Sequence, residues 1–177
     1  MMTLIVGGSG SGKSEFAEQM MLQYQTKRYY VATMKVYDEE GMARVRRHQE
    51  MRAKKNFTTI EQPMDIGRLN VELDCSVLVE CVSNLLANEM FDRTPCSKES
   101  LADKIVSELK LINSNVQNLV IVSNEIFSDG IMYEKTMMEY INILGDINKK
   151  LAAYADEVIE VVYSIPVYVK KYEPYKE

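Results

Sequence analysis

The sequence predicts an α/β protein with a mostly parallel β-sheet flanked by helices and a C-terminal antiparallel hairpin. Short apolar runs alternate along the chain with longer segments of helical periodicity, which is typical of such sheets. The last two apolar runs lie close together, which predicts the hairpin. No internal repeat, low-complexity stretch or Pro/Gly-rich linker divides the chain. We therefore expect a single domain over residues 1–170, followed by a charged tail at 171–177.

Strands and helices alternate through the first half of the chain. The expected strands are residues 4–6, 29–33, 57–60 and 76–80, and the expected helices are 14–25, 38–54 and a segment that ends near residue 90. Asp38 is a suitable N-cap for the second helix, which is strongly charged and has acidic residues in its first turn. The 76–80 strand is an apolar run that ends in the carboxylate of Glu80.

The second half of the chain contains two more helices and the remaining strands. Ser97 is expected to cap a helix whose apolar face carries Leu101, Ile105, Leu109 and Ile112. A strand is expected at 119–122, and after it a long helix with an apolar stripe made of Met137, Ile141, Leu144 and Leu151. Strands at 158–162 and 167–169 form the hairpin, with its turn expected at Ile165-Pro166.

Composition restricts the class of protein. The chain has 177 residues, enough for one substantial core, and 46% of them are hydrophobic, as in ordinary soluble domains. No apolar run is as long as a membrane span, so we expect no membrane association and a cytoplasmic protein. The net charge of −5 argues against a nucleic-acid partner. Cys75, Cys81 and Cys96 have no metal-binding spacing and are expected to be buried free thiols.

A glycine-rich segment directly follows the first expected strand. Residues 7–14 read Gly7-Gly8-Ser9-Gly10-Ser11-Gly12-Lys13-Ser14, which matches the pattern G-x-x-x-x-G-K-S. In a strand–loop–helix setting this pattern is a P-loop, whose backbone N–H groups cradle phosphates at a helix N-terminus. Lys13 can reach the β- and γ-phosphates, and the Ser14 hydroxyl can bind Mg²⁺. The alternative, a flexible Gly/Ser loop, does not explain the complete match, so we predict nucleoside triphosphate binding.

Polar residues lie at the carboxyl ends of three of the expected strands, which is where ligands bind in parallel sheets. Glu80 is placed where P-loop proteins have an acid near Mg²⁺, although an exposed carboxylate at a strand end is the alternative. Glu125 is expected to contact the substrate, the metal or an arginine, with helix capping or a structural ion pair as the alternative. Together with Thr33, these residues predict one site at the carboxyl edge of the sheet.

His48 is the only histidine of the chain. Arg44, His48 and Arg52 are spaced to share one helix face, where the arginines keep the imidazole neutral and able to attack phosphorus. A lone histidine on a basic helix is more often an inert surface residue. The surrounding residues 27–55 hold nine Lys/Arg against four Asp/Glu, which indicates either a solvated helix face or a path for an anionic substrate.

Several short motifs occur in an order that resembles one family. They are the P-loop, Tyr30-Val31-Ala32-Thr33, the helix pattern Asp38, Glu40, Arg44, His48 and Arg52, then Thr59 with Glu61, Val79-Glu80-Cys81 with Asn84-Leu85-Leu86, Ser123-Asn124-Glu125, Ala155-Asp156-Glu157-Val158, and Ile165-Pro166 with Lys170. In this order they resemble the bifunctional adenosylcobinamide kinase/adenosylcobinamide-phosphate guanylyltransferase family of cobalamin biosynthesis. The chain departs from the family pattern after Glu125, in lacking an arginine pair before the last long helix, and in having Ser164 where the family has glycine.

The resemblance implies two linked reactions and a homotrimer. Adenosylcobinamide is phosphorylated by GTP or ATP with Mg²⁺, and GMP is then transferred from GTP to that phosphate through a guanylyl-histidine at the position of His48. The candidate set comprises Lys13 and His48 as catalytic residues, Gly7, Gly8, Ser9, Gly10, Ser11, Gly12, Lys13, Ser14, Thr33, Arg44, Arg52, Glu61 and Glu80 as nucleotide-binding residues, Ser14 and Glu80 as metal ligands, and Glu125 as support for substrate or metal. Two alternatives stay open: the same fold with only one of the activities, and a non-catalytic nucleotide-binding subunit.

Overall fold

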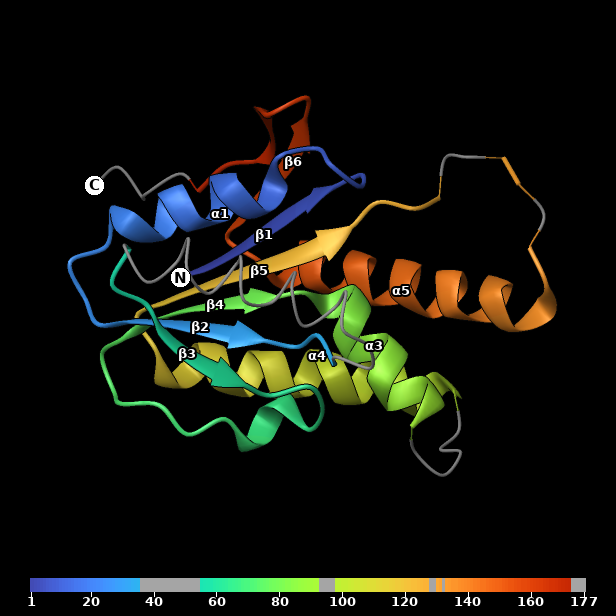
Figure 1. Cartoon of the computed structure of the whole chain (residues 1–177), viewed down its shortest axis with the longest axis horizontal. Helices are drawn as coiled ribbons and strands as arrows, with labels where there is room; N and C mark the ends of the chain where they lie inside the picture. Colours follow the sequence, from blue (N-terminus) through green and yellow to red (C-terminus); the bar gives the residue numbers. More distant parts are fainter. Residues whose placement is uncertain (36–54, 93–97, 128–129, 132, 173–177) are drawn as a thin grey trace.

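The computed structural model describes residues 1–35, 55–92, 98–127, 130–131 and 133–172. Their centre is a seven-stranded sheet of order β3-β2-β4-β5-β1-β6-β7 (Figure 1). Its strands are β1 (Met2–Gly7), β2 (Arg28–Ala32), β3 (Thr58–Glu61), β4 (Ser76–Glu80), β5 (Asn118–Asn124), β6 (Glu157–Val162) and β7 (Ile165–Lys170). All neighbouring strands pair in parallel except β6 and β7, which form an antiparallel hairpin. The predicted fold class is therefore confirmed.

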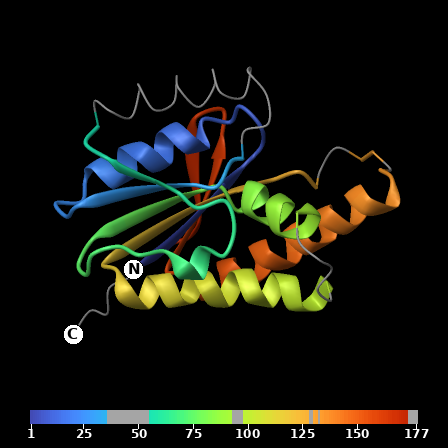
Figure 2. The same ribbon diagram turned by 60° about the horizontal axis from the view of Figure 1, so that its bottom comes forward.

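Helices cover both faces of the sheet (Figures 1 and 2). The helices are α1 (Lys13–Leu22), α3 (Val82–Phe91), α4 (Lys98–Asn115), α5 (Lys135–Tyr154) and the short 3₁₀ helix η1 (Ile66–Arg68). Helix α1 lies on one face across the central strands, whereas α3, α4 and α5 pack together on the other face. The helix expected at 38–54, the Ser97 cap and Cys96 lie outside the described residues.

Each central strand contributes to two cores because successive side chains point to opposite faces of the sheet. In β5, Leu119 and Ile121 face the core beneath α3, α4 and α5. Val120 and Val122 face the smaller core beneath α1. This two-sided burial explains why the strand is a continuous apolar run rather than an alternating one.

The apolar face expected on the helix after Ser97, which is α4, is confirmed. Leu101, Ile105, Leu109 and Ile112 of α4 are all at most 8% exposed. The two described cysteines that were expected to be buried free thiols, Cys75 and Cys81, are also confirmed as such.

The apolar stripe expected on α5 is wrong at its beginning. Met137 is 45% exposed, and the buried residues of the helix are Ile143, Leu144, Ile147 and Leu151. The first turns of α5 extend past the ends of the strands, so they have no sheet to pack against (Figure 1).

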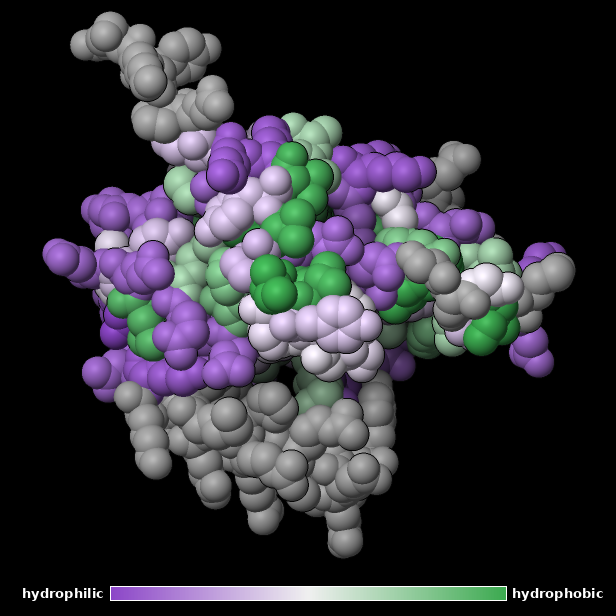
Figure 3. Space-filling view, turned by 90° about the horizontal axis from the view of Figure 1, so that it is seen from above, coloured by the Kyte–Doolittle hydropathy of each residue, from purple (hydrophilic) through white to green (hydrophobic). Residues whose placement is uncertain are grey.

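The hairpin turn also differs from the expectation. The chain reverses at Tyr163-Ser164, both in the left-handed region with φ of 50° and 63°, as a two-residue type I′ loop requires. Pro166 lies within β7 opposite Val161, because the outermost strand tolerates a residue without an N–H. Ile165 and Val167 of β7 are exposed. Seen from above, the surface carries small apolar patches among hydrophilic residues (Figure 3).

Candidate active site

The segment between β1 and α1 has the predicted strand–loop–helix form. Gly12 has a φ of 88° and directly precedes the first residue of α1. A Cβ on Gly7 would lie 2.7 Å from the backbone oxygen of Val161 and 2.6 Å from the hydroxyl of Ser11. Only glycine fits this close approach without a shift of the backbone. The loop therefore has the compact conformation in which backbone N–H groups can surround phosphate oxygens.

Lys13 points back over the loop. Its ammonium group donates a hydrogen bond of 2.9 Å to the carbonyl of Gly8, and the residue is only 8% exposed. Burial lowers the pKa of Lys13, against the opposing attraction of Cys81 and Glu80. A partly desolvated ammonium group lacks water ligands, which a phosphate oxygen would replace.

Ser14 and Glu80 are joined directly. The Ser14 hydroxyl donates to one carboxylate oxygen of Glu80, and the Tyr30 hydroxyl donates to the other at 2.6 Å. Oxygen donors of this kind suit Mg²⁺, which usually takes one or two protein ligands and completes its shell with water and substrate phosphates. The part of the chain that the structure describes holds no group of three His, Cys, Asp or Glu side chains that could bind a metal ion.

Sequence reasoning did not assign a role to Tyr30. The residue was expected to lie in a strand, and no motif marked its hydroxyl as functional. The parallel pairing of β2 with β4 places Tyr30 two residues before the end of its strand, on the same face as Glu80. Its ring is further held edge-on against Phe57, with 6.1 Å between the ring centres. An aromatic residue at this register could have been noticed only once the strand order was known.

Thr33 lies at the predicted edge but faces the backbone. Its hydroxyl donates to the carbonyl of Cys81 at 2.8 Å and accepts from the N–H of Cys81 at 2.7 Å. The residue is fully buried, and its carbonyl accepts a hydrogen bond of 2.7 Å from Asn88. Thr33 thus ties the end of β2 to the start of α3 next to Glu80.

Glu125 lies next to the P-loop. Its backbone N–H donates to the carbonyl of Gly7 at 3.0 Å, and its carboxylate accepts from the N–H of Phe127 at 3.0 Å. The neighbouring Asn124 donates to the hydroxyl of Ser83 at 2.7 Å, which links β5 to α3. The carboxylate of Glu125 is therefore held at the carboxyl edge, one strand away from Glu80.

Glu61 is a predicted site residue that the structure does not bring to this cluster. Glu61 ends β3, and three strands lie between it and β1. Its side chain is exposed. Arg44, His48 and Arg52 lie outside the described residues. The described residues that flank this segment are Lys35, which pairs with Asp92 at 2.6 Å, and Lys55, which pairs with Glu18 of α1 at 2.5 Å.

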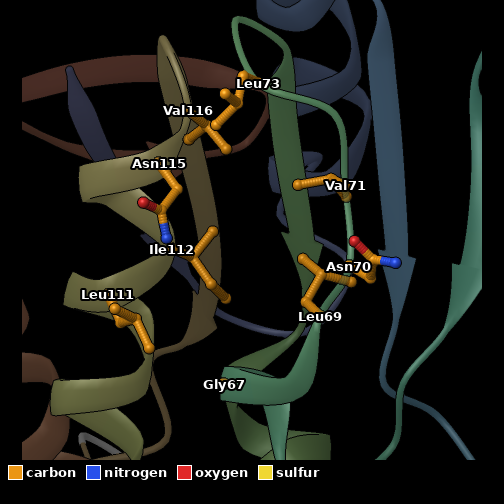
Figure 4. A pocket seen from close by; sticks show the side chains of 9 residues that line it. All are labelled: Gly67, Leu69, Asn70, Val71, Leu73, Leu111, Ile112, Asn115 and Val116. Carbon is orange, nitrogen blue, oxygen red and sulfur yellow. The ribbon is translucent and has the colours of Figure 1, made fainter.

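A separate cavity lies at the opposite ends of the strands, near the starts of β4 and β5. It has a volume of about 330 Å³ and is enclosed by the end of α4 and the segment before β4 (Figure 4). Its lining residues are Gly67, Leu69, Asn70, Val71, Leu73, Leu111, Ile112, Asn115 and Val116. None of these belongs to the P-loop edge, so the cavity is not part of the candidate site.

The fold and the loop geometry define an α/β protein of the P-loop NTPase-like class. A solved structure of a protein from Pyrococcus horikoshii OT3 shares this fold, with a TM-score of 0.56 over 97% of this chain and 87% of that one at 8% identity. The family model described as cobinamide kinase/cobinamide phosphate guanyltransferase matches residues 3–169, and the chain belongs to this family.

Curated relatives support this membership. The chain is 30% identical to the bifunctional adenosylcobalamin biosynthesis protein CobU of Escherichia coli K12, over 96% of this chain and all of that protein. It is 28% identical to CobU of Salmonella typhimurium LT2, also over 96% of this chain and all of that protein. It is 25% identical to the bifunctional adenosylcobalamin biosynthesis protein CobP of Pseudomonas aeruginosa PAO1, over 96% of this chain and 98% of that protein. Among the described helices, none combines the length and the apolar character needed to cross a bilayer.

Proposed function

We propose that the protein phosphorylates adenosylcobinamide and then transfers GMP from GTP to that phosphate, giving adenosylcobinamide-GDP in cobalamin biosynthesis. The observation that carries this proposal is an intact P-loop joined through Ser14 to Glu80, within a family match that spans residues 3–169. The family description contains both activities, a kinase and a guanyltransferase.

The kinase step uses the P-loop edge. The backbone N–H groups of the loop bind the triphosphate, and Lys13 offsets the charge that develops on the transferred phosphoryl group. Ser14 and Glu80 would hold Mg²⁺, which would supply further neutralisation of phosphate charge. The substrate hydroxyl attacks the γ-phosphorus, its proton is lost to water or base, and the nucleoside diphosphate leaves.

The guanylyl step uses His48. Its imidazole nitrogen attacks the α-phosphorus of GTP, and the bond to pyrophosphate breaks. The phosphate of the first product then attacks the same phosphorus, which forms the diphosphate linkage and frees the histidine. Arg44 and Arg52 bind the phosphates during both transfers. These roles rest on the sequence motif and the family resemblance.

Thr33 and Glu125 act by positioning in this proposal. Thr33 fixes the backbone beside Glu80, and Glu125 fixes the start of the loop after β5 through its bond to Phe127. Glu61, at the far edge of the sheet, stays a prediction from the motif alone. We also propose a cytoplasmic homotrimer, as the resemblance implies.

Incubation with GTP labelled at the α-phosphate tests the proposal. The wild-type protein should gain acid-labile, alkali-stable label, and His48→Ala should lose it while still phosphorylating adenosylcobinamide. Lys13→Ala is the matched control, which should impair phosphorylation by about 10²-fold or more because phosphate stabilisation is lost. Label that survives in His48→Ala would remove this histidine from the mechanism. Phosphorylation without any label in the wild type would favour a kinase alone.

A further inference from the structure

The tip of the β6–β7 hairpin packs directly against the P-loop. The N–H of Ser164 donates a hydrogen bond of 2.8 Å to the carbonyl of Ser11. A Cβ on Gly12 would lie 2.5 Å from the hydroxyl oxygen of Ser164 and 3.2 Å from its Cα. The turn therefore lies beside the predicted phosphate site. It is placed there because β6, the first strand of the hairpin, pairs with β1, which leads into the P-loop (Figure 1).

Tyr163 is the other residue of this turn. Its side chain is 89% exposed, the largest value among the large apolar residues of the described chain. Its φ of 50° lies in the left-handed region, which is unfavourable for a bulky aromatic residue and which asparagine or glycine would adopt more easily. Residues with such unfavourable backbone conformations cluster at active sites and ligand-binding segments.

The strand order indicates which part of a nucleotide would reach this turn. Glu80, at the end of β4, is joined to Ser14 and marks the side of the P-loop that faces the metal and the terminal phosphates. The hairpin lies on the opposite side of β1 from β4. A triphosphate whose terminal phosphates point toward β4 directs its nucleoside away from β4, toward β6 and β7.

We propose that the ring of Tyr163 stacks on the base of the nucleoside triphosphate held by the P-loop. This inference rests on the proposed nucleotide-dependent function and adds a base-binding residue to it. Stacking on an aromatic face is strong but tolerant of base identity, because every base has a π-face. Tyr163 therefore contributes affinity for both GTP and ATP and does not discriminate between them.

Binding measurements on the full chain with Mg²⁺ test the inference, using GTP, ATP and inorganic tripolyphosphate as three separate ligands. Tyr163→Ala should bind GTP and ATP about tenfold more weakly, since loss of one stacking contact has roughly this effect. Its affinity for tripolyphosphate should be unchanged, because that ligand has no base. Tyr163→Phe should keep the wild-type affinities because the ring is retained. Tyr168→Ala, which removes another exposed tyrosine of the hairpin, is the matched control and should change none of them.

Two results would overturn the inference. Unchanged GTP affinity in Tyr163→Ala would show that the ring does not contact the base. An equal loss for GTP and tripolyphosphate, or a changed oligomeric mass with that loss, would show that the turn acts only on the loop or on subunit contacts. Failure of the proposed function gives a different pattern: GTP still binds with the Tyr163 dependence, but no label reaches His48.

Discussion

At the scale of single residues, the site is built around the carboxylate of Glu80. One oxygen accepts from Ser14 and the other from Tyr30, so both ends of the group are fixed. The backbone beyond it is fixed by Thr33 through two hydrogen bonds to Cys81. A carboxylate held in this way keeps one orientation, which favours the binding of a metal whose geometry is strict.

We expect Lys13 to make the proposed nucleotide binding depend on pH. Burial lowers its pKa in the free protein, against the attraction of Cys81 and Glu80, and a bound triphosphate favours the charged form and raises the pKa again. At pH values between the pKa of the free protein and that of the complex, binding is therefore accompanied by the uptake of a proton. Affinity should be full below the pKa of the free protein and fall by up to about tenfold per pH unit as the pH rises between them.

Titration calorimetry with tripolyphosphate over the alkaline range measures this effect, and buffers of different ionisation enthalpy report the proton uptake. Lys13→Arg is the control, because a guanidinium stays charged throughout this range. The affinity of that variant should lack the alkaline decline. A decline of the same size in Lys13→Arg would assign the titration to another group.

At the scale of elements, the two halves of α5 differ in how deeply their apolar residues are buried. Its second half packs Leu144, Ile147 and Leu151 against the sheet, whereas its first turn leaves Met137 exposed. Leu144→Ala should lower the free energy of unfolding by about 2–5 kcal/mol, because it leaves a cavity in a close-packed core. Met137→Ala should change it by less than about 0.5 kcal/mol. Denaturant unfolding measures both, and similar losses for the two variants would contradict this division of the helix.

The same helix shows how far sequence patterns reach. Apolar spacing predicted the helix and its inner residues Leu144 and Leu151, because helical periodicity depends only on the local sequence. It also included Met137, because spacing does not show where the partner surface ends. The hairpin turn was misplaced for a related reason: Ile165-Pro166 looked like a turn, while Tyr163-Ser164 has neither Gly nor Asn to mark its left-handed backbone.

The candidate site could be predicted where it depends on contiguous motifs. The P-loop residues and the strand ending at Glu80 were recognisable because each is a short segment with its own chemistry. The contacts of Tyr30 with Glu80 and of Ser164 with Ser11 depend on strand order and register. The residues of each pair are far apart in the chain, so no local sequence pattern predicts that they are in contact.

At the scale of the whole molecule, parallel strands gather distant residues at one edge. Gly7 pairs in register with Asn124, and Glu80 with Val122, so the P-loop, Glu80 and Glu125 meet although more than half the chain separates the first from the last. The edge opposite this one holds the cavity at the end of α4. The two ends of the sheet therefore differ in chemistry: the first carries the charged side chains of Lys13, Glu80 and Glu125, and the cavity at the second is lined by uncharged residues.

The surface of β7 leads to the last prediction. This strand is at the edge of the sheet, and Ile165, Val167 and Val169 on it are 65%, 47% and 65% exposed. Natural proteins usually protect an edge strand with charge or with a covering element, and apolar exposure of this kind indicates an association surface. We expect light scattering of the eluted protein to give three times the chain mass. The mass should persist at about 1 M salt, where exposed ion pairs are screened within roughly 3 Å but apolar contacts are not weakened. A monomer at micromolar concentration, or dissociation by salt, would contradict a trimer held by apolar surfaces.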